Sequence, residues 1–274
     1  MTTTIAVEDV SFAYPDGTQA LVEVELQIPR GQRIAIVGQN GSGKSTLVRH
    51  FNGLLRPTRG RILLDGLDTA DVHVAHLASR VGLAFQNPDR QIFAGRVKAE
   101  VAFGPRNIGM APAEVEQAVY SALEAVGLTG QGDTNPYDLG YSRRKLLALA
   151  SVLAMRTPIV VLDEPTTGQD ARGVARVQKI VTDLGDAGRT VIAISHDMRF
   201  VAESFERVIV MRAGRIILGG TPSQVFAEES WDVLASTYLE PPLAARIGAR
   251  AGKGETPTDA ILIEALRARE ATAT

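Results

Sequence analysis

Short apolar runs and longer segments with helical spacing divide this chain into predicted strands and helices. Apolar runs that are rich in β-branched residues and end at turn residues predict strands, and they cover residues 5–10, 21–28, 33–37, 61–64, 81–85, 159–162, 190–194, 207–211 and 215–218. Apolar residues recur at helical spacing within residues 44–54, 112–126, 142–155, 171–186 and 222–227. The early strands follow one another closely and the later strands alternate with helices. This order predicts an α/β fold with an antiparallel β layer at its N-terminal end.

A glycine-rich run joins predicted strand 33–37 to predicted helix 44–54, and it reads Gly38-Gln39-Asn40-Gly41-Ser42-Gly43-Lys44-Ser45-Thr46. Its spacing, Gly-x-x-x-x-Gly-Lys-Ser, is that of a phosphate-binding P-loop. A strand that turns through glycines into a helix N-terminus presents successive backbone N–H groups to an anion. We expect Lys44 to reach the β- and γ-phosphates and the Ser45 hydroxyl to bind Mg²⁺. The chain is therefore expected to bind a nucleoside triphosphate.

Two adjacent acids, Asp163 and Glu164, follow a predicted buried strand. Ligands of open α/β sheets bind where such strands end. We therefore expect Asp163 to hold Mg²⁺ and Glu164 to polarise the water that attacks the γ-phosphate. Gln86 and His196 also follow predicted strands. Because parallel strands end at the same edge of a sheet, Gln86 is expected to reach the metal or the water, and His196 the γ-phosphate.

Composition narrows the class of protein further. The chain has 274 residues, of which 45% are hydrophobic, and it has no cysteine. It is long enough to bury a sizeable core and offers no disulfide or thiolate metal site. Its net charge of −2 gives no case for nucleic acid as a partner. The most apolar stretch, residues 146–155, is too short to span a bilayer, so any membrane role is expected to need a partner protein.

The motifs, taken in order, resemble those of the nucleotide-binding subunit of an ATP-binding cassette (ABC) transporter over residues 5–225. The resemblance implies a P-loop NTPase cassette with an N-terminal antiparallel β layer, a RecA-like core sheet and a helical subdomain near residues 88–156. It also implies an ABC ATPase domain over residues 1–228 that binds ATP and Mg²⁺. Residues 229–274 are expected to form an extension that contacts a second ATPase or another partner, or that is only a surface extension.

Individual residues match motifs of this family. The P-loop is its Walker A motif, Asp163 and Glu164 complete Walker B, and Gln86 resembles the Q-loop glutamine. His196 resembles the switch histidine, and Asp170 lies in a segment that resembles the D-loop. Tyr14 resembles the aromatic residue that stacks on adenine, although a tyrosine packed at a turn is the simpler interpretation of that residue alone.

Two segments are similar to a narrower group, the ATPases of energy-coupling factor importers and their cobalt and nickel relatives: Phe85-Gln86-Asn87-Pro88-Asp89-Arg90-Gln91-Ile92-Phe93 and Glu100-Val101-Ala102-Phe103-Gly104-Pro105. Those machines take up vitamins or transition-metal ions through a transmembrane coupling subunit and a membrane substrate-binding subunit. The resemblance implies that this chain is peripheral, on the cytoplasmic face of the cell membrane. It also implies that the segment after Gln86 contacts the membrane partner.

The family signature, usually Leu-Ser-Gly-Gly-Gln, is degenerate here and reads Leu139-Gly140-Tyr141-Ser142-Arg143. In the family it opens a helix that faces the γ-phosphate bound by the other subunit. Gly140 lacks a hydroxyl donor and Tyr141 replaces a glycine, but Ser142 is expected to cap the helix and leave its N–H groups pointed at phosphate. Two copies of this chain would form two weakened sites, so we expect a heterodimer with a paralogous ATPase.

Three other functions are alternatives to an importer ATPase. Soluble ABC proteins of DNA repair or translation usually carry coiled coils, zinc modules or a second cassette, which this sequence does not show. A largely non-hydrolytic regulatory subunit is compatible with the weak signature and remains the alternative, although an intact Glu164 and His196 argue against it. A P-loop kinase for small molecules would not need the residues that match the Q-loop and the switch histidine.

Overall fold

Strands rich in valine, isoleucine and alanine form a six-stranded central sheet in the computed structural model, which describes residues 3–272. The spatial order is β10-β9-β3-β8-β7-β6, with β3 (Arg33–Val37), β6 (Val81–Ala84), β7 (Ile159–Asp163), β8 (Thr190–Ile194), β9 (Arg207–Arg212) and β10 (Arg215–Gly220). All neighbours pair in parallel except β10, which is antiparallel to β9. The carboxyl ends of the parallel strands therefore share one edge.

Both faces of the central sheet are buried, which explains why its strands read as continuous apolar runs. Side chains alternate between the faces along each strand. In β3, Ile34 and Ile36 belong to one buried cluster, whereas Ala35 and Val37 belong to the other. The central sheet is thus the shared wall between two cores.

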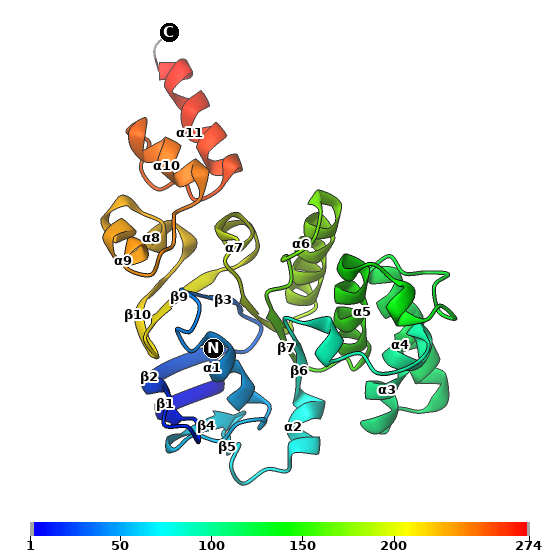
Figure 1. Cartoon of the computed structure of the whole chain (residues 1–274). Helices are drawn as coiled ribbons and strands as arrows, with labels where there is room; N and C mark the ends of the chain where they lie inside the picture. The colour runs from blue at the N-terminus through cyan, green and yellow to red at the C-terminus, as the bar shows by residue number, and fades with distance from the viewer. Residues whose placement is uncertain (1–2, 273–274) are drawn as a thin grey trace.

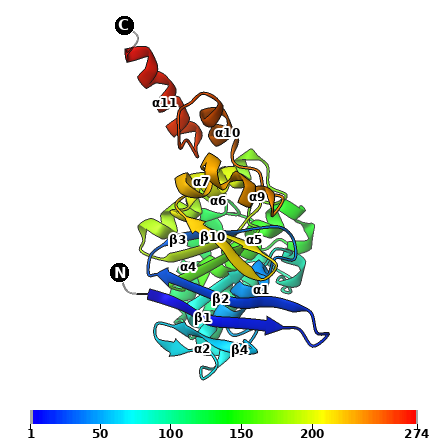
Figure 2. The same ribbon diagram turned by 90° about the vertical axis from the view of Figure 1, so that its left-hand side faces the viewer.

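An antiparallel sheet covers one face of the central sheet (Figure 1 and Figure 2, blue). Its order is β2-β1-β4-β5, with β1 (Thr3–Ala13), β2 (Gln19–Pro29), β4 (Arg59–Leu64) and β5 (Leu67–Asp68). Helices α1 (Lys44–Phe51) and α2 (Val74–Arg80) complete this layer. Phe51 and Leu77 join Ile34 and Ile36 in its core.

A helical lobe is inserted between β6 and β7 and lies to one side of the central sheet (Figure 1, green). It contains the short 3₁₀ helix η1 (Pro88–Arg90), α3 (Val97–Asn107), α4 (Pro112–Ala125), a second 3₁₀ helix η2 (Pro136–Asp138) and α5 (Tyr141–Ala154). Helices α3 and α4 both pack on α5. Because α5 also contacts β6 and β7, it joins the lobe to the sheet.

The C-terminal part begins with helices that cover the second face of the sheet and ends in a projecting arm (Figure 1). Its elements are α6 (Ala171–Asp186), α7 (Met198–Ser204), α8 (Pro222–Val225), the 3₁₀ helix η3 (Glu228–Ser230), α9 (Trp231–Ala235), α10 (Leu243–Arg250) and α11 (Asp259–Thr272). Leu234 and Leu239 are buried with the main core, while both views show α10 and α11 extending away from the sheets (Figure 1 and Figure 2). No helix within residues 3–272 is both long enough and apolar enough to cross a membrane.

The α/β class, the antiparallel N-terminal layer and all the strands expected from the apolar runs are confirmed. The sequence pattern missed β5, α2, α3, α7, α9 and α10, which are short or interrupted by glycine and proline. Such helices depend on tertiary packing more than on propensity. For example, α10 continues through Gly248 to Arg250. Gly248 allows this because Thr256 packs so closely on it that a β-carbon would clash.

Leu234 provides a test of whether the chain after residue 228 is part of the folded core. Leu234 is fully buried in the main core, whereas Leu243 on α10 is 66% exposed. We expect Leu234→Ala to lower the free energy of unfolding by about 2–5 kcal/mol, because it removes buried methyl groups and leaves a cavity. The matched control, Leu243→Ala, should change it by less than about 0.5 kcal/mol. Urea unfolding measures both, and equal midpoints for the two variants would contradict the packing described here.

Candidate functional site

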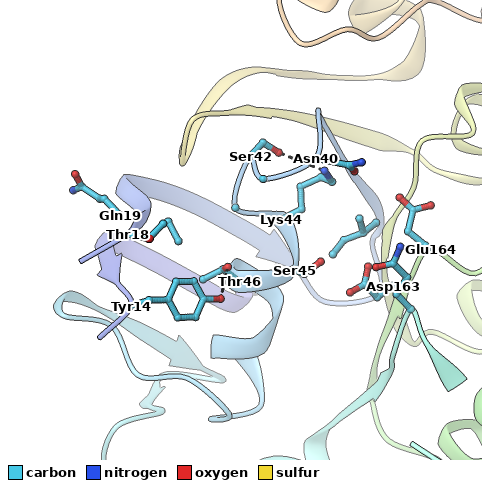
Figure 3. Close-up of a pocket in the computed structure, with 15 residues that line it drawn as sticks. Tyr14, Thr18, Gln19, Asn40, Ser42, Lys44, Ser45, Thr46, Asp163 and Glu164 are labelled. Carbon is cyan, nitrogen blue, oxygen red and sulfur yellow. Dashed lines mark hydrogen bonds between the residues drawn. The ribbon is translucent and has the colours of Figure 1, made fainter. Parts of the chain in front are cut away.

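A cavity of about 320 Å³ opens where the P-loop meets the carboxyl ends of the central strands (Figure 3). Its lining comes from the β1–β2 turn, the P-loop and the ends of β6, β7 and β8, and consists of Tyr14, Thr18, Gln19, Ala20, Asn40, Gly41, Ser42, Gly43, Lys44, Ser45, Thr46, Gln86, Asp163, Glu164 and Ile194. Figure 3 shows Tyr14 at one end and Asp163 and Glu164 at the other, with the P-loop side chains between them. The cavity therefore brings together residues that are 150 positions apart in the sequence.

The P-loop backbone needs glycine at two positions where the chain passes close to its neighbours. Gly38 has φ +145° and Gly43 has φ +100°, both in the region that glycine tolerates best. A β-carbon on Gly38 would lie 2.2 Å from the carbonyl oxygen of Met211, and one on Gly43 would lie 2.4 Å from that of Ala20. Since no side chain caps α1 and no acid lies in its first turn, the first N–H groups of the helix are left for an anion.

Lys44 is buried at the floor of the loop. Its Nζ donates to the carbonyl oxygens of Gly38 at 2.7 Å and Gln39 at 2.8 Å. Burial lowers the pKa of Lys44, and the negative charges of Glu164 and Asp163 oppose that shift. A cation held here beside the helix N-terminus is suited to the phosphate chain of a nucleotide.

Asp163 is the side chain of this cavity that best fits a metal ion. It ends β7, is 5% exposed, and its Oδ1 has no hydrogen-bond partner among the residues that the structure describes. Burial raises the pKa of Asp163, whereas a hydrogen bond from Ser45 opposes the rise. A hydroxyl and an unpaired carboxylate oxygen beside a phosphate site suit Mg²⁺, which keeps several non-protein ligands. Among the described residues, no group of three or more His, Asp or Glu side chains is placed to hold a metal ion.

Glu164 is 7% exposed and lies next to Asp163 at the same strand end. Nδ1 of His196 lies 2.7 Å from Oε2 of Glu164, and the hydroxyl of Thr167 donates to the same oxygen at 3.2 Å. A carboxylate accepts only, so His196 donates its Nδ1 proton in this pair. The two donors fix the direction of the carboxylate, which is what a group that orients a water molecule requires.

The structure separates Gly140, Ser142 and Asp170 from this cavity. Gly140 is the N-cap of α5, and Asp170 caps α6 by accepting from the Gly173 N–H at 2.7 Å. The expectation that Ser142 caps its helix is wrong. Ser142 lies inside the first turn, where its hydroxyl donates to Oε1 of Gln169 at 2.8 Å, and Gln169 donates back to the Ser142 carbonyl at 3.1 Å. This reciprocal pair fastens the first turn of α5 to the turn that precedes α6 in the same chain.

Sequence reasoning missed two groups of residues near the cavity. Thr18, Gln19 and Ala20 line it, and their only signal is that they follow Tyr14 across a turn. Lys145, on α5, is 5% exposed and donates to the carbonyls of Glu164 and of Thr167. Burial lowers the pKa of Lys145 to about 8, with the charges of Glu164 and Asp163 opposing the shift. A lysine on a helix is usually solvated, so no pattern of residue types distinguishes Lys145 from a surface lysine.

Comparison with known proteins agrees with this geometry. The family model described as ABC transporter matches residues 21–167. An ABC transporter ATP-binding protein of Caldanaerobacter subterraneus subsp. tengcongensis is 44% identical over 249 residues, which span 91% of this chain but 43% of that protein. The energy-coupling factor transporter ATP-binding protein EcfA of Methanothermobacter thermautotrophicus is 41% identical over 226 residues, covering 82% of this chain and 73% of that protein. The structure of cbiO1 from Clostridium perfringens, described as part of the ABC transporter complex cbiONQ, is 36% identical with a TM-score of 0.75, covering 90% of this chain and 99% of that chain.

A P-loop, two acids at the end of another strand of the same sheet and a mostly parallel central sheet define a P-loop nucleoside triphosphatase. The chain belongs to the ABC transporter family, and it is an ABC ATPase that binds ATP.

The close approach at Gly38 generates a test of the cavity. We expect Gly38→Ala to weaken binding of a fluorescent ATP analogue at least about tenfold, because the new β-carbon forces the loop away from Met211. Gly66 also has a positive φ, +84°, but its β-carbon would meet nothing within 4 Å and it lies outside the cavity. The control Gly66→Ala should therefore keep the wild-type affinity while losing about 1–2 kcal/mol of stability. Unchanged nucleotide affinity in Gly38→Ala would show that this loop does not shape the binding site.

Proposed function

We propose that this ABC ATPase hydrolyses ATP at the cavity and thereby powers an importer of the energy-coupling factor type, for vitamins or transition-metal ions. The observation that carries the hydrolytic part is the Glu164 carboxylate, held by His196 and Thr167 beside the P-loop. The importer part is supported by the similarity to EcfA and to cbiO1 over most of the chain.

In this proposal separate groups of residues bind the phosphates, hold the metal ion and orient the attacking water. The P-loop N–H groups and Lys44 bind the phosphates, and Ser45, Asp163 and Gln86 would hold Mg²⁺, whose charge stabilises the negative charge on the phosphates. Glu164 orients the attacking water, and His196 keeps the Glu164 carboxylate in place while reaching toward the γ-phosphate. No bond is made to the protein, so catalysis here consists of positioning and electrostatic stabilisation.

Tyr14 is assigned to the adenine ring. It lies at the end of the cavity farthest from Glu164, as Figure 3 shows, and its hydroxyl is 2.9 Å from the hydroxyl of Thr46. Phe12 packs edge-on against the Tyr14 ring with the centroids 5.0 Å apart. A ring held in this way offers a stacking surface for a base.

The signature segment and Asp170 are assigned to the nucleotide of a second subunit. Gly140, Ser142 and Asp170 lie outside the chain's own cavity, which agrees with a role across a dimer interface. The degenerate signature favours a heterodimer with a paralogous ATPase. In the same model, residues 1–228 act as the ATPase domain, with residues 88–156 as its helical subdomain and residues 229–274 as an extension toward the second ATPase or another partner.

An apolar groove of about 320 Å³ is assigned to the transmembrane coupling subunit. It lies beside the segment that follows Gln86, and its lining includes Leu54, Phe85, Phe93, Phe103 and Met155. Phe93 and Phe103 are 60% and 47% exposed, and their rings meet edge to face at 4.7 Å. Exposed aromatic residues around a hollow are typical of a protein interface. The partner bound there would hold this chain as a peripheral subunit on the cytoplasmic face of the membrane, together with a membrane substrate-binding subunit.

Glu164→Gln tests the hydrolytic assignment. We expect kcat for ATP to fall about 10²–10⁴-fold, because the amide no longer accepts a proton from water. The dissociation constant for ATP should stay within about twofold, since binding rests on the P-loop. Glu116→Gln on the exposed face of α4 is the matched control and should keep the wild-type kcat. An unchanged kcat in Glu164→Gln would contradict the role given to Glu164, whereas a wild type without measurable hydrolysis would favour a non-hydrolytic regulatory subunit.

The groove is tested by recovering a tagged chain from detergent-solubilised native membranes, followed by mass spectrometry. The wild type should bring down a small multi-helix membrane protein and a second, different ATPase. The double variant Phe93→Ser and Phe103→Ser should lose the membrane protein at least about fivefold and keep the ATPase, because only the groove has lost its aromatic surface. Tyr120→Ser removes an equally exposed aromatic on α4, 60% accessible, and should change nothing. Recovery of nucleic-acid factors, or of this chain alone, would contradict the importer.

A further inference from the structure

Lys145 has an unusual environment for a lysine. It lies in the second turn of α5, between the signature segment and the rest of the helix, and it is 5% exposed. Buried lysines are normally paired with a carboxylate. Here Nζ donates instead to two backbone carbonyls, those of Glu164 and of Thr167, the latter at 3.0 Å. Both carbonyls belong to the turn that carries the proposed catalytic carboxylate.

The backbone of that turn has a conformation that needs support. Glu164 has φ +53°, in the left-handed region that residues with a β-carbon rarely adopt. Its N–H is fixed by the carbonyl of Ile194 at 2.9 Å on the neighbouring strand. With φ positive, its carbonyl turns away from the strand and points at α5. A buried carbonyl without a donor would favour a return to the extended conformation. The Lys145 ammonium supplies that donor.

The direction of the Glu164 side chain follows from this backbone conformation. Its carboxylate is held at the far end by His196 and Thr167, and Thr167 is itself the second residue that Lys145 binds. The charged groups that face Lys145 are Asp163 and Glu164 at the end of β7. Neither carboxylate has a hydrogen bond to Lys145 among the described residues. The Lys145 ammonium therefore stabilises the backbone conformation of the turn through its hydrogen bonds rather than through an ion pair with one carboxylate.

We propose that Lys145 is a positioning residue for ATP hydrolysis: it holds Glu164 in its left-handed conformation, so that the carboxylate faces the γ-phosphate end of the cavity. Lys145 does not line the nucleotide cavity, so it acts through Glu164 and not on the substrate. The inference rests on the proposed role of Glu164, which the Glu164→Gln variant tests by itself.

The test compares Lys145→Met, which keeps the length and apolar stem of the side chain, with wild type in the assembly in which the chain purifies. We expect kcat for ATP to fall at least about tenfold while the dissociation constant for ATP stays within about twofold. Lys145→Gln has a shorter, neutral amide that reaches at most one carbonyl, and its kcat should fall at least about fivefold. This variant replaces Lys145→Met if Lys145→Met does not give the wild-type circular dichroism spectrum. Lys179→Met is the matched control, because that lysine is 74% exposed and its ion pair within the part of the chain that the structure describes is with Asp183 on the same helix. It should keep full activity.

A double-mutant cycle separates positioning from general damage. If Lys145 acts through Glu164, adding Lys145→Met or Lys145→Gln to Glu164→Gln should lower the residual rate by less than about twofold. The proposal would be overturned if the Lys145 substitution lowered kcat by the same factor in the wild-type and in the Glu164→Gln background. It would also be overturned if a folded Lys145 variant kept the wild-type kcat, or if its affinity for ATP fell in parallel with kcat. If Glu164→Gln alone is fully active, the function proposed for Glu164 fails, and that failure is seen without any Lys145 variant.

Discussion

Burial of the central sheet on both faces is the constraint on which the rest of the molecule depends. Because apolar side chains cover each face of β3, β7 and β8, the polar groups of the site can stand only at the strand ends. The parallel pairing of these strands then places the P-loop, Asp163 and His196 along one edge. The register of the sheet therefore aligns the loops that carry these residues.

The same burial makes the charges of the site interdependent. Asp163 and Glu164 are adjacent, and both lie almost out of contact with water. Two lysines lie close enough to interact with both acids, Lys44 on α1 and Lys145 on α5, and burial lowers the pKa of each. The two negative and two positive charges compensate one another within the site, which limits the free-energy cost of removing four charges from water. This balance is held by backbone contacts, because both lysines donate to carbonyl oxygens.

Much of this could be predicted from the sequence, for physical reasons that differ between residues. The P-loop is a local motif whose spacing itself determines the turn, and strands buried on both faces give unbroken apolar runs such as residues 159–162. The helix α3 was missed because Gly104 and Pro105 interrupt its pattern. The prediction that Ser142 caps α5 was wrong because its hydrogen-bond partner, Gln169, is near it only in the folded chain. Lys145 could not be found for the same reason: its role depends on a carbonyl direction that no residue type encodes.

Helix α5 connects three parts of the molecule that the sequence keeps apart. Its first residues carry the degenerate signature, Lys145 holds the Glu164 turn, and the carbonyl of Ala148 accepts from Gln91, whose other amide atom accepts from the Phe85 N–H beside the apolar groove. These points lie within about 10 Å along one helix, and Lys145 sits between the other two. The centre of α5 falls at residues 147–148, so a tilt of the helix about its centre would leave the Ala148 contact nearly still and move Lys145 together with the signature segment. Because the signature segment and Lys145 share the first two turns of α5, a shift of that end of the helix would displace Lys145 as well, and through it the turn that carries Glu164.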